Sequence, residues 1–180
     1  MAEEKKEKWL SWLALTTVVF AVGATLATFK GGSYSTRALL CQTQASDQWA
    51  FYQAKSIKAN LYVLQKEQLE LQLGLLGPAA STDARAAYGG RIAAGALRIL
   101  KYEQEQTKIK ADAEALEKNR DDSKRHQAAF GVAVIFLQIT ILLSSVAALM
   151  KRRTLWYAAL VLGTIGMVQF ANGFLLFFEN

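Results

Sequence analysis

The sequence has little of what catalysis and covalent cross-linking require. Its 180 residues include one cysteine, one histidine and one proline. The lone Cys41 excludes an intramolecular disulfide, and one cysteine with one histidine provides neither a metal cluster nor a nucleophile with an activating base. No Gly-x-x-x-x-Gly-Lys phosphate loop occurs. We therefore predict that the chain is not an enzyme and that it carries no catalytic residue, metal site or cofactor.

Charged residues are absent from three long stretches, residues 9–29, 128–150 and 155–178. Each has about the 20 apolar residues that a helix needs to cross a bilayer. The first stretch follows basic residues, as a secretory signal does, but the apolar core of a signal peptide is only about 7–15 residues long. We therefore predict three transmembrane helices, the first a retained anchor, with residues 1–8 and the turn 151–154 in the cytoplasm.

Positive charge gathers at the ends of these stretches. The net charge of +6 and pI near 9.5 therefore reflect topology signals, and we expect no nucleic-acid partner. Basic and aromatic residues that we expect at the cytoplasmic surface are Lys5, Lys6, Lys8, Trp9, Trp12, Lys151, Arg152, Arg153, Trp156 and Tyr157. This distribution predicts a multi-pass membrane protein with residues 30–127 on the side away from the cytoplasm.

Residues 30–127 are rich in Ala, Leu, Gln and charge, a composition that favours long helices. Two series of residues at alternating steps of three and four predict two coiled-coil helices. The first series is Leu40, Thr43, Asp47, Ala50, Ala54, Ile57, Leu61, Leu64, Gln68, Leu71 and Leu75. The second is Tyr88, Ile92, Gly95, Ile99, Tyr102, Gln106, Ile109, Ala113, Leu116 and Arg120.

A turn separates the two series. Gly77 suits a left-handed helix end, Pro78 stops the helix, and Ser81 or Thr82 can cap the next one. The helices then fold back so that facing residues have numbers summing to about 159, which brings the two series together. We predict an all-α membrane protein with three transmembrane helices and a long antiparallel coiled-coil hairpin between the first and second.

Glycine pairs mark two further places. Gly31 and Gly32 follow the first predicted span, where we expect a bend in the chain. Gly89 and Gly90 lack the strand that a dinucleotide fingerprint requires, so we interpret them as sites of close helix approach or local flexibility.

The motif Asp-Gln-Trp-Ala-Phe-Tyr-Gln-Ala-Lys-Ser-Ile-Lys occupies residues 47–58. It resembles the signature of a bacterial membrane family known as domain-of-unknown-function (DUF) family number 4337. The resemblance extends over nearly the whole chain, from one span through a helical segment to two closing spans. It implies a bacterial inner-membrane protein, in which residues 30–127 would lie in the periplasm, and it assigns no activity.

A second stripe runs along the first predicted coiled-coil helix. It includes the residues Trp49, Tyr52, Ser56, Ala59 and Val63, preceded by Ala45, again at steps of three and four. A hairpin needs only one seam per helix, so we predict that this stripe is an oligomer interface between chains. The alternative is that Trp49 and Tyr52 belong to the hairpin's own core.

Apolar residues at the turn, Leu75, Leu76, Pro78 and Ala79, predict a contact site at the hairpin tip; alternatively they only close the turn. Intramembrane polar residues are Gln138, Gln169 and Asn172. We expect Gln138 and Gln169 to lie at similar depth and to join two spans by hydrogen bonds. The alternative role is to line a pore.

These features predict a non-enzymatic, oligomeric inner-membrane scaffold or accessory protein that presents a coiled-coil stalk for protein contacts. Its expected partners are membrane lipids, further copies of the chain and, in one alternative, another membrane protein. That alternative is an accessory subunit of a larger membrane enzyme complex. The other is an oligomeric channel with polar residues lining the pore.

Overall fold

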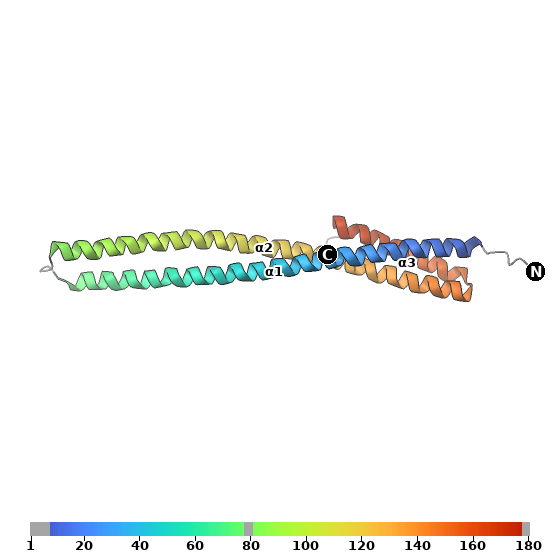
Figure 1. Ribbon diagram of the computed structural model, residues 1–180, viewed down its shortest axis with the longest axis horizontal. Helices are drawn as coiled ribbons and strands as arrows, with labels where there is room; N and C mark the ends of the chain where they lie inside the picture. Colours follow the sequence, from blue (N-terminus) through green and yellow to red (C-terminus); the bar gives the residue numbers. More distant parts are fainter. Residues whose placement is uncertain (1–7, 78–80, 178–180) are drawn as a thin grey trace, which may run out of the picture. The chain divides into compact units, whose positions relative to one another are not determined.

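Three helices make up the computed structural model, which describes residues 8–77 and 81–177 (Figure 1). They are α1 (Lys8–Leu75), α2 (Thr82–Met150) and α3 (Arg153–Leu175). The two long helices α1 and α2 pack antiparallel as a hairpin, and each of the three is long and apolar enough to cross a membrane. The predicted all-α hairpin architecture is thereby confirmed.

The chain divides into two compact units. The first unit combines the chain up to Leu40 with the chain from Asn119 onward, and the second runs from Cys41 to Lys118. The first unit therefore holds the amino-terminal part of α1, the carboxy-terminal part of α2, and α3. The second unit, which we call the hairpin unit, holds the remaining parts of α1 and α2.

Three apolar clusters lie along the first unit. At one end Trp9 and Leu13 pack on Ala147, with Trp156 against them. Further along, Phe20 packs with Leu137, and beyond it Phe130 packs with Ala27 and Ala133. The Trp9 and Trp156 rings lie 6.3 Å apart, so the two ends that we expected at one membrane surface are adjacent within this unit.

Helix α3 approaches its neighbours through residues without side chains. A Cβ atom added at Gly163 would lie 2.4 Å from Cζ of Phe20, and one added at Gly166 would lie 3.2 Å from the backbone nitrogen of Leu137. Contacts of 2.4 Å essentially never occur and contacts of 3.2 Å are rare, so a larger residue at either position would force its neighbours to move. Small residues at helix contacts are typical of membrane helices, where close packing replaces the hydrophobic effect as the source of association.

The chain does not leave the helix at Gly31 and Gly32, where we expected a bend, because α1 is helical through both residues. Glycine lowers helix stability by only about 1 kcal/mol and breaks no backbone hydrogen bond, so the surrounding helix continues. A Cβ atom at Gly31 would lie 3.3 Å from Cβ of Phe130. Gly31 therefore permits a close contact between α1 and α2.

The turns follow the local chemistry of the sequence. Gly77 adopts a φ of 62°, the left-handed conformation that glycine accepts without strain. Ser81 caps α2, since its Oγ accepts a hydrogen bond from the amide of Ala84, and Asp83 lies in the first turn of α2. Between α2 and α3 the chain turns at Lys151, whose φ is 51°.

Candidate functional site

The hairpin unit buries a different face of α1 from the one we predicted. On α2 the predicted series is confirmed, because its members are buried or half-buried. They are Tyr88, Ile92, Gly95, Ile99, Tyr102, Gln106, Ile109, Ala113 and Leu116. On α1 the buried and half-buried series is Cys41, Ala45, Gln48, Tyr52, Lys55, Ala59, Tyr62, Lys66, Leu69, Leu73 and Leu76. The predicted seam of α1 was therefore wrong in phase.

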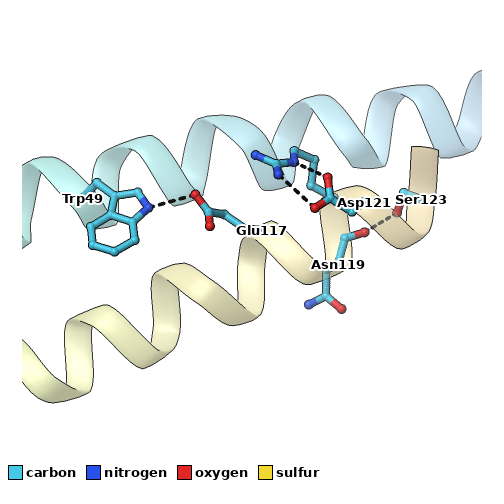
Figure 2. A network of polar contacts seen from close by, with 6 residues as sticks. Trp49, Glu117, Asn119, Asp121 and Ser123 are labelled. Carbon is cyan, nitrogen blue, oxygen red and sulfur yellow. Dashed lines mark hydrogen bonds and ion pairs between the residues drawn. The ribbon is translucent and has the colours of Figure 1, made fainter. Parts of the chain in front are cut away.

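Polar and aromatic contacts hold this seam together. The indole of Trp49 donates a 3.0 Å hydrogen bond to Oε1 of Glu117, and Figure 2 shows the two side chains pointing toward one another from α1 and α2. Trp49 and Tyr52 meet edge to face at 5.7 Å. Trp49 of the second stripe therefore contacts α2 within the hairpin, and contact of this stripe with another chain stays a prediction.

A charged cluster lies further along the seam. Nζ of Lys55 lies 2.6 Å from Oε2 of Glu105 and 5.3 Å from the ring centre of Tyr102. Tyr102 stacks on Tyr62 at 5.8 Å, and the hydroxyl of Tyr62 accepts a 2.6 Å hydrogen bond from Arg98. These contacts join residues whose numbers add up to about 160, so the predicted level of the two helices is confirmed.

The Lys55 ammonium holds the pKa of Glu105 below its ordinary value of 4.5, chiefly through their hydrogen bond. A carboxylate with a lowered pKa stabilises the fold above the unfolded value, and that stabilisation is lost as the pH falls through the lowered folded value. In urea titrations followed by circular dichroism, Glu105→Gln should lower the hairpin's unfolding midpoint above pH 4.5, with the difference disappearing in stronger acid. Glu103→Gln, at an exposed site nearby, is the control; equal shifts in both variants would contradict the assignment.

The face of α1 opposite the seam carries large exposed side chains. We call Ile57, Leu61, Leu64, Leu71 and Leu75, together with Gln68, the outer α1 stripe; these aliphatic side chains are between 60% and 84% exposed. A shallow depression around Leu71, Gly74 and Leu75 lies on it. At the tip, Leu75 is exposed and Leu76 half-buried, while Pro78 and Ala79 lie outside the described residues.

The three polar residues that we predicted to lie within the membrane differ in exposure. Gln138 is exposed on α2, Gln169 is half-buried and Asn172 is 2% exposed. Among residues 8–77 and 81–177, no hydrogen bond joins Gln138 to Gln169, so that expectation was wrong. Similar depth does not make two side chains face each other, because one step along a helix turns the direction by about 100°, and it is the preceding Leu137 that faces α3.

His126 connects the three helices of the first unit. Its Nδ1 lies 2.8 Å from the carbonyl oxygen of Gly173 on α3, and its ring stacks on Tyr34 of α1 at 4.5 Å. A carbonyl only accepts, so Nδ1 carries the proton and donates. The last carbonyls of a helix lack partners within it, and His126 supplies one from α2. Sequence reasoning missed this role; the only signal was a histidine beside an apolar stretch.

In the part of the chain that the structure describes, no three His, Cys, Asp or Glu side chains gather closely enough to hold a metal ion. Cys41 is buried in the seam. The features that distinguish the hairpin unit are the polar seam between α1 and α2 and the exposed outer α1 stripe.

These features define an all-α protein with a long antiparallel hairpin and three helices apolar enough to be membrane spans. The chain belongs to the family described as Domain of unknown function (DUF4337), which matches residues 9–176. The resemblance seen in residues 47–58 is thereby confirmed over almost the whole chain. No curated protein and no solved structure matches the sequence.

Proposed function

We propose that this protein is a non-enzymatic, homo-oligomeric scaffold of a bacterial inner membrane, whose three helices span the bilayer and whose coiled-coil hairpin presents a surface for protein contacts. The single observation that supports the membrane assignment is the exposed surface of the first unit. Large apolar side chains cover it, among them Phe29 at 70%, Leu142 at 67% and Leu149 at 86% exposure. Soluble monomers rarely expose apolar patches of more than a few hundred Å².

The coiled-coil assignment is supported by the alternation of three and four along both buried series of the hairpin unit. Homo-oligomerisation is supported by the outer α1 stripe, since exposed leucines at heptad spacing outside a bilayer favour another helix over water. The channel alternative has weaker support. Gln138 is exposed whereas Asn172 is buried, so the polar side chains of one chain do not form a common surface.

The full chain extracted in mild detergent should test this proposal. In membranes, we expect the chain to resist alkaline extraction. In detergent, native mass spectrometry should give a protein mass that is a multiple of 19.8 kDa. In planar bilayers, the purified protein should show no conductance. Release at alkaline pH would contradict spanning helices, and a monomeric mass would contradict the homo-oligomer. Stoichiometric recovery of a second membrane protein would instead support the accessory-subunit alternative.

A further inference from the structure

The back of α2 carries an exposed stripe that the hairpin itself does not use. Its members are Ala86, Gly90, Ala93, Leu97 and Leu100, at steps of four and three. We call them the outer α2 stripe. All five are exposed, and a Cβ atom added at Gly90 would have no neighbour within 4 Å. Glycine lowers helix stability, yet none of the described residues lies close enough to Gly90 to require it, and close approach within the hairpin does not explain it.

The two outer stripes stand level with each other. Cβ of Lys66 would lie 4.0 Å from a Cβ atom at Gly95, and both helices rise about 1.5 Å per residue in opposite directions. Equal steps from this contact therefore place Leu71 level with Gly90 and Leu75 level with Ala86. By the same count Leu64 and Leu61 stand level with Leu97 and Leu100. Gln68 is level with Ala93.

Near the tip the two stripes are also complementary in size. The outer α1 stripe has leucines near the tip, where the outer α2 stripe has glycine and alanine. Each stripe faces away from the other helix of its own hairpin, because each lies opposite its seam. The large side chains of one hairpin can therefore meet the small residues only of a neighbouring hairpin.

We infer that the partner of the outer α1 stripe is the outer α2 stripe of a second copy of this chain. This inference rests on the proposed membrane scaffold, because copies anchored in one bilayer share an orientation, and side-by-side copies in one orientation keep level residues level. Leu71 of one copy then faces Gly90 of the next. The resulting pair of helices is antiparallel, as within the hairpin.

Such a contact joins two different surfaces, so each copy can bind one neighbour through its outer α1 stripe and another through its outer α2 stripe. Head-to-tail contacts of this kind close into a ring when the rotation between copies allows it. The five aliphatic side chains of the outer α1 stripe hold about twenty methylene-sized groups of roughly 30 Å² each. At exposures between 60% and 84% they offer about 400 Å². An equal area on the partner gives about 800 Å², which approaches the ~1,000 Å² of the smallest specific interfaces.

Disulfide cross-linking of the full chain in membranes tests the pairing. In a Cys41→Ala background, Leu71→Cys combined with Gly90→Cys in one chain should give, on oxidation, a ladder of covalent multimers that ends at the ring size. Each single substitution should give at least tenfold less dimer. As a control, Lys58→Cys with Glu103→Cys places thiols at exposed, level positions off the stripes and should give no ladder. Labelling with a maleimide checks that all four thiols react.

Four results would overturn the inference. Dimers formed by Leu71→Cys alone would show contact between two α1 stripes, and cross-links to another protein would show a foreign partner. Absence of the ladder from a chain that is oligomeric by native mass would refute this interface while leaving the proposed scaffold standing. A monomeric mass would refute both.

A second comparison uses adjacent glycines. Gly89 and Gly90 both lack neighbours within 4 Å of an added Cβ atom, but only Gly90 lies on the outer α2 stripe. Gly90→Leu should fill the space that Leu71 of the next copy needs and raise the concentration for half-dissociation at least tenfold. Gly89→Leu should leave it unchanged and match the helicity of Gly90→Leu. Equal oligomer masses for the two variants would contradict the contact.

Discussion

Replacing Gly166 with leucine should separate α3 from α2 and destabilise the first unit by about 3 kcal/mol, the upper part of the usual range for overpacking. A Cβ atom there would already lie 2.9 Å from Cγ of Leu137 and 3.2 Å from its backbone nitrogen. Leu137 is fully buried, so it has no free space to move into. Unfolding in mixed micelles with increasing dodecyl sulfate, followed by circular dichroism, measures the loss.

Gly131→Leu is the matched control. Gly131 is exposed on α2, and an added Cβ atom there would have no neighbour within 4 Å. Because leucine favours a helix over glycine by up to about 1 kcal/mol, this variant should be as stable as the parent or slightly more so. If both variants lose the same stability, the contact between α3 and α2 is looser than the geometry indicates.

The second large effect should distinguish the two faces of α1 in the hairpin unit. Ala59→Glu places a carboxylate in the seam, where Ala59 is 6% exposed, and should destabilise the hairpin by about 3 kcal/mol, since burying an unpaired charge is costly. Leu61→Glu changes a side chain that is 60% exposed. Exposed substitutions usually stay within about 0.5 kcal/mol, so the hairpin should keep its stability.

Hydrogen exchange followed by mass spectrometry on peptides from residues 41–118 reads out this comparison. Amides in that range should lose protection in Ala59→Glu and keep it in Leu61→Glu. The opposite order would restore the leucine series as the seam. In the full chain, Leu61→Glu should also weaken self-association, because the substitution places a charge on the outer α1 stripe.

The sequence was sufficient to predict the helices, their antiparallel pairing and the level at which they meet. It did not predict which face of α1 is buried, because α1 carries two stripes with the same spacing. Periodicity identifies a repeat but cannot choose between two phases of it. Helix α2 also has two stripes, but glycine and alanine make up most of its outer stripe, so the bulkier stripe was identified correctly as the seam.

The choice between the stripes depends on what α2 offers. Its seam is already bulky, with Tyr102, Ile109 and Leu116, so small residues such as Ala45 and Ala59 leave room for it. Trp49 and Lys55 find Glu117 and Glu105 across the seam. The more hydrophobic leucine series was the natural expectation for a core, yet complementarity with the facing helix outweighs hydrophobicity alone. The same reasoning explains why His126 and the direction of Gln138 were missed, since both depend on neighbours remote in sequence.

The mixed chemistry of the seam restricts how the hairpin can slide. A seam of leucines would tolerate displacement by one heptad, because every leucine would meet another. Here a shift of seven residues would remove Glu117 from Trp49, Glu105 from Lys55 and Tyr102 from Tyr62 together, leaving polar groups facing apolar ones. The seam therefore favours a single alignment of α1 with α2. Any partner that recognises both helices at once meets the same pairs of side chains in every copy.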